Sequence, residues 1–337
     1  MMIKRNPRST IIIFGYIIFN MMIVITAYTT KNTMEALPGQ AGGKAPEYTL
    51  IENLDYFHVK DGLPLMSLSA LNMKSQGEEI AEFERPVGIY NQHSRNSTIK
   101  YHALEGVYRK VKDSLVLLGD VKVNNEEATY EADKLRYLLK KDLVYGSGNV
   151  RFNGKDPKTG DEFKINSEKM KARPNLKQSE FTGAVNGVLQ KKRKYESPMK
   201  FRSQLLTFDG VQSYAHLEGD VYMNKDAMRA TGGKADIYLE NYNKSLKYFV
   251  MNDDVKLTES LRNPQTGVME ERKAFAERLE GFGREEKMIL TGAPRVEMGK
   301  DVIKGYRITV REGTDLVEVD DAMSDMEMKK KEKKAKE

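Results

Sequence analysis

Residues 216–259 read HLEGDVYMNKDAMRATGGKADIYLENYNKSLKYFVMNDDVKLTE and contain three runs in which apolar and polar side chains alternate. The runs are 217–223, 235–239 and 248–257, and polar turn residues separate them. Alternation with a period of two is typical of β-strands that bury one face. This stretch therefore predicts three consecutive strands joined by short turns.

The same pattern recurs along the chain. LLGDVKV at 117–123 matches LEGDVYM at 217–223, and looser copies stand at 146–152, 181–188 and 290–298. Their glycines lie about 29 to 37 residues apart, except before the last copy, where NDDV at 252–255 fills the gap. A glycine inside a strand marks a bulge or a close backbone approach. The spacing predicts one small β unit used repeatedly, with each copy burying the apolar face of the next.

The formal net charge of +6 lies at the two ends of the chain. Residues 1–8 contribute +3 and residues 329–337 contribute +4, which leaves −1 for the body. A nearly neutral body has no net attraction for a polyanion, so we expect no nucleic-acid partner. The absence of cysteine does not decide the compartment.

Residues 9–30 carry no charge and contain the apolar run IIIFGYIIFNMMIVITA, with Lys4, Arg5 and Arg8 before it and Lys31 after it. The run is long enough to cross a bilayer, and the preceding basic residues predict a cytoplasmic N-terminus. A cleaved signal peptide is the alternative, although no clean small-x-small site follows. We expect a cytoplasmic basic segment at 1–8, a transmembrane anchor at 9–30 and a flexible tether at 31–46.

The remainder predicts an all-β protein with two modules. In the first module, 47–190, we expect strands at 56–59, 65–71, 86–90, 99–103, 114–123, 135–145 and 150–152, with turns at 61–62, 124–125 and 153–154. The basic run Lys191–Lys194 and Ser197-Pro198 predict a linker at 191–198. A second β module follows at 199–321, and the lysine-rich tail 322–337 is expected to be disordered.

Several of these stretches resemble a known family. Residues 47–73, 83–90 (FERPVGIY), 98–108 (TIKYHALEGVY) and 114–123 (SLVLLGDVKV) resemble LptC, the membrane-anchored periplasmic lipopolysaccharide-transport family. Residues 217–257 and 288–322 resemble the OstA-like domain of its partner LptA. The chain departs from the family in carrying both modules, which are usually two proteins.

The resemblance implies a β-jelly-roll of stacked antiparallel strands whose apolar interior carries the acyl chains of lipopolysaccharide. It implies a single-pass inner-membrane protein with a periplasmic body, which receives lipopolysaccharide from the permease subunits of an ABC transporter. It also implies edge-to-edge joining, through strands near 47–59 and 302–319, to the transporter and to an LptA-like or outer-membrane LptD-like module. No cofactor is expected. The alternative is a non-transporting envelope scaffold with a closed core.

The alternation itself predicts which side chains face the interior, because every second residue of a strand points to the same side. From the residues alone, this interior is either a closed core or an open groove, and the resemblance favours a lipid-binding groove. The expected groove-lining residues are Leu117, Val121, Val123, Leu135 and Tyr137 in the first module, and Leu217, Val221, Met223, Ile237, Leu239, Val255, Leu257, Val296, Ile308 and Val310 in the second.

We expect no catalytic and no metal site. His58, His93, His102 and His216 are scattered without metal-ligand spacing. Asp120, Asp220 and Asp253 follow the repeat, and we expect them beside turns. No nucleophile has an evident base partner, so an enzyme acting on envelope polysaccharide is a weaker hypothesis. Lys191–Lys194 and the C-terminal lysine run could contact lipid phosphates, but solvated linkers and tails are the commoner explanation of such runs.

Overall fold

The structure is a computed structural model that describes residues 48–60, 62–77, 79–92, 97–125, 127–156, 159–192, 197–240, 246–262, 267–314, 316–321 and 323–325. The predicted segments 1–8, 9–30 and 31–46 lie outside these residues, as does nearly all of the predicted tail 322–337. Within the described part of the chain, there is no helix with the length and apolarity that a membrane crossing requires.

The chain divides into two compact units. The first comprises Met1–Asp156 and Lys164–Phe181, and the second comprises Pro157–Phe163 and Thr182–Glu337. The division falls inside strand β11 (Gln178–Gln190). The module boundaries expected from the sequence stay predictions.

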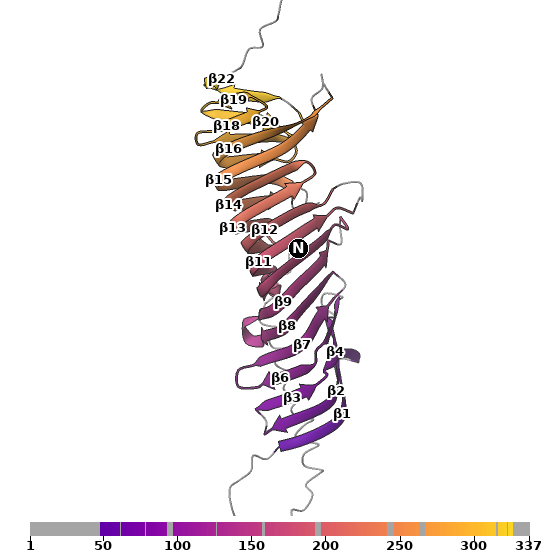
Figure 1. The fold of residues 1–337 in the computed structure, drawn as a ribbon. Coiled ribbons are helices and arrows are strands. Elements are labelled where there is room, and N and C mark those ends of the chain that lie inside the picture. Colours follow the sequence, from indigo (N-terminus) through magenta and orange to yellow (C-terminus); the bar gives the residue numbers. More distant parts are fainter. Residues whose placement is uncertain are drawn as a thin grey trace, which may run out of the picture. The chain divides into compact units, whose positions relative to one another are not determined.

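The first unit consists of strands and two short 3-10 helices in its described residues (Figure 1). The strand pairings described within it are antiparallel, which confirms this part of the predicted fold class. The elements are β1 (Tyr48–Lys60), β2 (Leu63–Gln76), β3 (Ile80–Glu84), β4 (Val87–Gln92), β5 (Ser97–His102), β6 (Glu105–Arg109), β7 (Ser114–Asn124), β8 (Ala128–Leu138), η2 (Leu139–Lys141), β9 (Leu143–Lys155), β10 (Glu162–Arg173) and η3 (Pro174–Leu176).

Two sequence predictions for this unit are wrong. The strand expected at 135–145 is broken, because η2 and Asp142, with φ of 47°, turn the chain between β8 and β9. Apolar residues lie on both sides of the turn, so the sequence pattern resembles that of one continuous strand. The turn expected at 153–154 lies inside β9, since Gly154 still pairs with Ala128 of β8.

The second unit is also antiparallel throughout its described pairings, and β13 to β16 follow one another as neighbours (Figure 1). Its strands are β12 (Met199–Asp209), β13 (Tyr214–Lys225), β14 (Met228–Leu239), β15 (Leu246–Arg262), β16 (Met269–Phe282), β17 (Lys287–Thr291), β18 (Arg295–Met298), β19 (Asp301–Lys304), β20 (Arg307–Arg311), β21 (Val317–Asp320) and β22 (Met323–Asp325).

A bulge interrupts alternate long strands near their middle. In β13 the register shifts between Glu218 and Val221, so that Gly219 and Asp220 face a single residue of β14, Gly233. Strands β7, β9 and β15 carry register shifts of the same kind. An extra residue bends a strand and increases its twist. The repeating unit is therefore one bulged strand and one regular strand, which accounts for the spacing of the glycines in the sequence.

Both residues of each bulge have a left-handed backbone, with φ between 45° and 81°. The pairs are Gly119-Asp120, Gly148-Asn149, Gly183-Ala184, Gly219-Asp220, Asp253-Asp254 and Gly292-Ala293. The left-handed region costs a residue with a Cβ about 1–2 kcal/mol, and Asp and Asn tolerate it best. Asp120 and Asp220 thus lie within strands at bulges, not beside turns as predicted.

Crowding is a second reason for glycine at the first bulge position. A Cβ on Gly219 would lie 2.8 Å from the Cβ of Gln204 on β12. In β15 the first bulge residue is Asp253, and the neighbouring strand β14 instead provides the glycine, Gly233. A Cβ on Gly233 would lie 2.7 Å from the Cβ of Asp253. One of the two residues that meet at this bulge is therefore a glycine.

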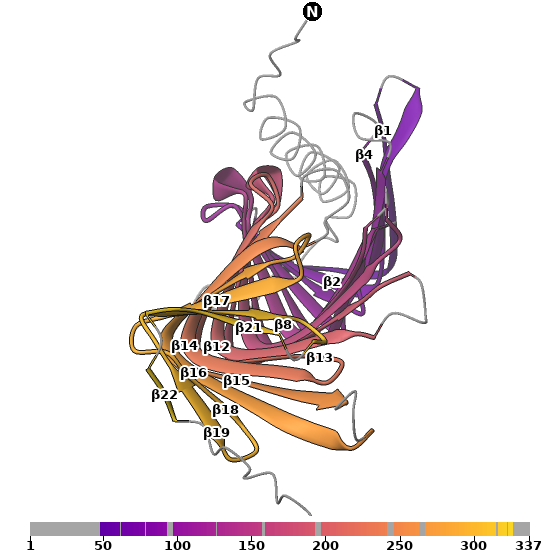
Figure 2. The ribbon, with the colours of Figure 1, turned by 90° about the horizontal axis from the view of Figure 1, so that it is seen from above.

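The sheet of the second unit divides at its last bulge, Gly292-Ala293. Strand β16 pairs through one half with β17 and through the other half with β18. Strands β20 and β21 continue from β17, while β19 and β22 continue from β18. In Figure 2, β17 and β21 lie on one side of this junction and β18, β19 and β22 on the other.

We name two arms after this division. The β17 arm comprises residues 214–218, 234–239, 246–252 and 278–282 with β17, β20 and β21. The β18 arm comprises residues 221–225, 228–232, 255–262 and 269–276 with β18, β19 and β22. The bulges join the arms, so each long strand contributes inward-facing side chains to both.

The bulge contact predicts a compensating pair of substitutions. Gly233→Ala should lower the free energy of unfolding by about 1–3 kcal/mol, because the new methyl group collides with Asp253 and not because of its backbone angle. In an Asp253→Gly background, the same substitution should cost much less. Urea unfolding of both singles and the double variant measures this coupling. Equal costs in both backgrounds would mean that the contact is not what requires glycine.

Candidate functional site

The centre of the second unit is a tightly packed apolar row. Cross-strand pairing places Leu217, Ala235, Met251, Leu279, Leu290 and Ile308 side by side on β13, β14, β15, β16, β17 and β20. Each of these residues is at most 1% exposed. This row stabilises the β17 arm, and a second buried row, Met223, Ala230, Leu257, Ala274 and Val296, lines the β18 arm.

In the structure, the residues that the sequence predicts to line the groove face the interior. In the first unit, Leu117, Val121 and Leu135 form one buried cluster, against which the partly buried Val123 and Tyr137 pack. In the second unit, Leu239 is half-buried and the other predicted residues are buried, namely Leu217, Val221, Met223, Ile237, Val255, Leu257, Val296, Ile308 and Val310. Their contact with lipid stays a prediction, and most are too well covered to offer free surface.

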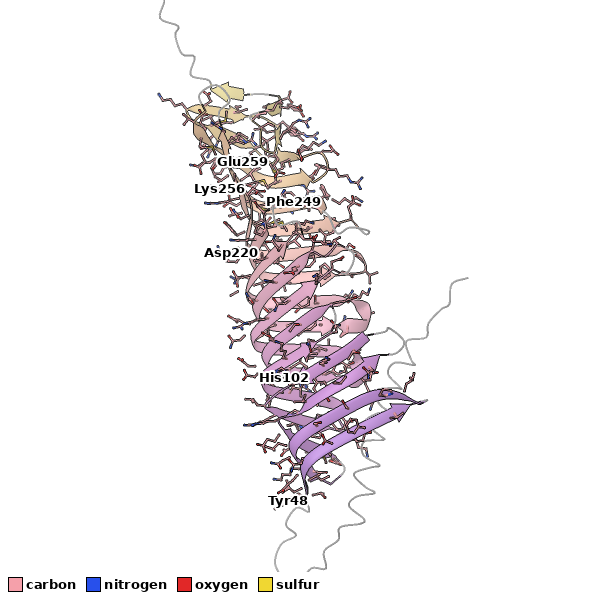
Figure 3. All side chains as sticks on the ribbon, turned by 90° about the vertical axis from the view of Figure 1, so that its right-hand side faces the viewer. Tyr48, His102, Asp220, Phe249, Lys256 and Glu259 are labelled. Carbon is pink, nitrogen blue, oxygen red and sulfur yellow. The ribbon has the colours of Figure 1, made fainter. Side chains whose placement is uncertain are left out.

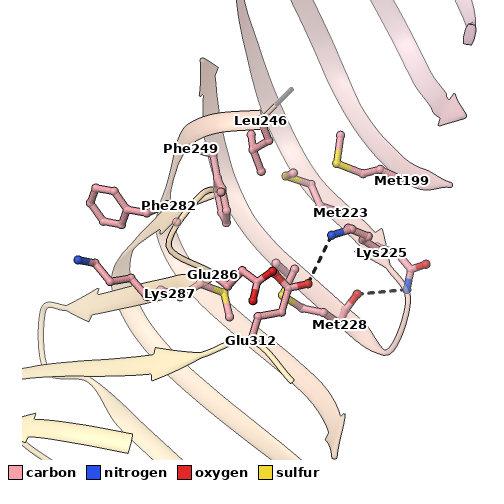
Figure 4. A pocket seen from close by; sticks show the side chains of 15 residues that line it. Met199, Met223, Lys225, Met228, Leu246, Phe249, Phe282, Glu286, Lys287 and Glu312 are labelled. Atoms are coloured by element: carbon pink, nitrogen blue, oxygen red, sulfur yellow. Dashed lines mark hydrogen bonds and ion pairs between the residues drawn. The ribbon is translucent and has the colours of Figure 1, made fainter. Parts of the chain in front are cut away.

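An accessible hollow lies beside this packed row, between the two arms (Figure 4). It is a shallow hollow, partly open to solvent, with a cavity volume of about 60 Å³. The β17 arm contributes Leu246, Phe249, Gly281 and Met288, and the β18 arm contributes Met223, Met228 and Ala230. Met199 of β12 completes the apolar lining, while Lys225 and Glu312 lie at the rim.

The walls of the hollow are adaptable. Gly281 has no side chain, and the ring of its register neighbour Phe249 occupies the space over it, since a Cβ on Gly281 would lie 1.9 Å from that ring. Four methionines line the walls. Methionine is unbranched and flexible, so such walls adapt to chains of different shape. The arrangement can bind an apolar chain without any reactive group.

The sequence predictions included Met223 and missed the rest of the hollow. Extending the alternation of Val255 and Leu257 backwards along β15 would have found Met251 and Phe249, because the bulge preserves the inward positions. Met228 and Met199 lie at the ends of their strands, where alternation gives the weakest signal.

A buried ion pair lies near the free end of the β18 arm. Arg272 of β16 and Glu259 of β15 are 1% and 3% exposed, and their side chains form a direct hydrogen-bonded salt bridge. Arg272 also donates from Nη1 to the carbonyl of Thr314 (2.7 Å) and from Nη2 to that of Arg311 (3.0 Å). Both residues occupy inward positions of the alternation, and charged residues there on paired strands are a sequence signal for such a pair.

The outer face of the β17 arm carries a separate polar cluster. The Tyr214 hydroxyl donates to Asp236 Oδ1 (2.5 Å), and His216 Nδ1 lies 2.7 Å from the same oxygen. Burial alone would raise the pKa of Asp236, but the contacts with Tyr214, His216 and Arg278 lower it overall. A row of aromatic rings in tilted contact follows the same strands, namely Tyr214, Tyr238, Tyr248 and Phe282. These contacts fix neighbouring strands and leave no free reactive group.

The four histidines do not assemble into a metal site in the part of the chain that the structure describes. His216 contacts Asp236 and Glu218, and His102 lies on another strand, β5. Among the described residues, no group of three His, Asp or Glu side chains could hold a metal ion. His93 and the side chain of His58 lie outside the described set.

Comparison with known families identifies the chain. The family model described as "Lipopolysaccharide-assembly, LptC-related" matches residues 15–190, just over half of the sequence. The chain belongs to this family. A second model, "LptA/(LptD N-terminal domain) LPS transport protein", matches residues 202–315. The resemblance noted in the sequence, an LptC-related part followed by an LptA-like part, is confirmed.

One solved structure illustrates the likeness. LptH of Pseudomonas aeruginosa, described as the LptA-homologous periplasmic component of the lipopolysaccharide transport device, matches with 13% identity and a TM-score of 0.35. The match covers 39% of this chain and 96% of LptH. A search of curated proteins gave no match.

These family assignments settle the general role of the protein. It is a periplasmic lipopolysaccharide-transport protein built from LptC-related and LptA-like parts, and its families are transport proteins and not enzymes. The hypothesis of a polysaccharide-cleaving enzyme and that of a non-transporting scaffold do not agree with this assignment.

Removing one member of the buried ion pair should lower the free energy of unfolding. Arg272→Met leaves Glu259 charged and unpaired in the interior, which typically costs about 3–5 kcal/mol. The double variant Arg272→Met/Glu259→Leu removes both charges and should recover most of this loss. Urea unfolding of the three proteins measures the difference. A double variant as unstable as the single one would show that the charges stabilise the fold by themselves.

The Asp236 cluster predicts a loss of stability in acid. Because the folded pKa of Asp236 is lowered, its contribution is present above the ordinary value of about 4 and is lost as the pH falls through the folded value. Asp236→Asn should therefore lose less free energy of unfolding between about pH 5 and pH 2 than the unmodified protein. Tyr214→Phe, which removes one lowering contact, should give an intermediate result. Parallel acid profiles in all three proteins would contradict the assignment.

Proposed function

We propose that the protein is anchored in the inner membrane by residues 9–30, receives lipopolysaccharide from an ABC transporter and passes it toward the outer membrane. The observation that supports this proposal most directly is the methionine-lined hollow between the arms of the second unit. The hollow lies in the LptA-like part, is open to solvent and has an apolar lining. The acyl chains of lipopolysaccharide are ligands of that chemistry.

The energetics of acyl-chain burial suit a carrier. Each methylene moved from water into an apolar site contributes about 0.8 kcal/mol, so reversible binding needs the burial of a whole acyl chain of about a dozen methylenes. The packed rows beside the hollow contribute stability and little free surface. In this proposal the lipid lies against the adaptable methionines and Phe249, and the sequence-predicted residues form the wall behind them.

The ends of the units provide strands for joining to other proteins. In the described residues, β1 pairs with β2 alone, and β21 pairs with β20 alone. An unpaired strand edge is a template for another strand. We assign β1 to the side of the transporter permease subunits, and β21 and β22 to an LptA-like or LptD-like module. The basic run Lys191–Lys194 has no assigned role in this scheme.

In-cell photo-crosslinking tests lipid carriage. A photoreactive phenylalanine analogue at Phe249 or Met228, both lining the hollow, should yield a lipopolysaccharide adduct. The matched control is Lys234, which is exposed on the outer face of β14 and should yield none. Adducts at the control alone, or at no position in folded protein, would contradict the proposal.

A further inference from the structure

The turn between β20 and β21 reaches from one arm of the second unit to the other. We call residues 311–314 the strap. On the β17 arm, the backbone N–H of Glu312 donates to the carbonyl of Glu286 (2.8 Å), in the turn before β17. On the β18 arm, the strap contacts Lys225, Glu259 and Arg272. The strap therefore links the free ends of the two arms beside the hollow.

The base of the strap is held firmly. Glu259 accepts a hydrogen bond from the backbone N–H of Gly313 (2.8 Å), and Arg272 donates to the carbonyls of Arg311 and Thr314 on either side. Both side chains are almost fully buried and paired with each other. A charge-assisted contact shielded from water is strong and is little screened by salt. Figure 3 labels Glu259 and, on the other arm of the same strand, Phe249 of the hollow.

The contact at the rim of the hollow is weak by comparison. Lys225 Nζ and Glu312 Oε1 lie 3.5 Å apart, and their side chains are 48% and 36% exposed (Figure 4). Exposed ion pairs of this kind contribute little and break readily. Both residues also line the hollow, so this ion pair lies where a chain entering from the side would pass. Gly313, with φ of 73°, gives the strap the left-handed turn that places Glu312 beside Lys225.

We propose that the strap is a side gate of the methionine-lined hollow, with Arg272 and Glu259 as positioning residues that anchor it and with Lys225–Glu312 as its latch. The inference rests on the proposed function, since it concerns how lipid enters and leaves the same hollow. Opening breaks the exposed ion pair and swings the Lys225 and Glu312 side chains away from the hollow, while the anchored backbone of the strap stays in place. The neighbouring strands need not separate.

A reversible lock tests the gate directly, because the chain contains no cysteine. Lys225→Cys/Glu312→Cys is bridged with a reducible bis-methanethiosulfonate linker in the purified full-length protein in detergent. A photoreactive residue at Phe249 then reports the rate of lipopolysaccharide loading. We expect the bridge to slow loading at least about tenfold, and reductant to restore it. Undiminished loading with the bridge intact would overturn the gate.

A matched control separates the gate from general stiffening. Lys234 and Glu218 form an ion pair of 3.8 Å on the outer face, with similarly exposed side chains. Lys234→Cys/Glu218→Cys, bridged by the same reagent, should load at the unmodified rate, and equal slowing in this control would overturn the gate. Glu312→Gln, which weakens the latch without a bridge, should speed loading about two- to fivefold.

The same experiment distinguishes failure of the gate from failure of the proposed function. Loading of the reduced, unbridged protein reports whether the hollow accepts lipopolysaccharide at all. Its dependence on the bridge reports on the strap. If the unbridged protein takes up no lipid while its unfolding midpoint is unchanged, both proposals fail. If it loads and the bridge has no effect, only the gate fails.

Discussion

The close approach of strands at each bulge is the constraint on which the rest of the structure depends. Two consecutive residues with left-handed backbone bend a strand in its middle and bring it against the neighbouring strand without space for two side chains. The bend gives each long strand of the second unit two arms with inward-facing apolar residues. An unbent sheet with the same alternation would have one apolar face and no interior between arms.

Function follows from a local departure from this regular packing. Where neighbouring side chains cover every inward position, as in the row from Leu217 to Ile308, the interior is closed. At Gly281 the Phe249 ring covers the backbone, and flexible methionines line the space beside it. The balance between a stable wall and an accessible hollow therefore depends on a few residues within a repeated pattern. Transport by such a protein needs binding that is firm enough to hold a lipid and weak enough to release it.

Alternation and repeat spacing predicted the all-β fold and the inward side of the strands, because both depend on local sequence. The alternation could not distinguish residues of the packed rows from residues that line the hollow. Leu257 and Met223 both occupy inward positions, and the difference between them depends on the side chains that neighbouring strands place opposite. The alternation also missed the turn at Leu139–Asp142, although three charged residues, Lys140, Lys141 and Asp142, interrupt the apolar residues there. The buried Arg272–Glu259 pair depends on the register between β15 and β16, and the residue pattern within a single strand does not give that register.

The central claim is that the interior between the arms holds lipid in the cell. Native mass spectrometry of the full-length protein, extracted from cells in mild detergent, measures this most directly. Lipid carriage predicts a folded species heavier than the chain by the mass of at least one lipopolysaccharide molecule, which is lost on denaturation. A folded protein that carries only its own mass, from cells in which lipopolysaccharide is being exported, would contradict it.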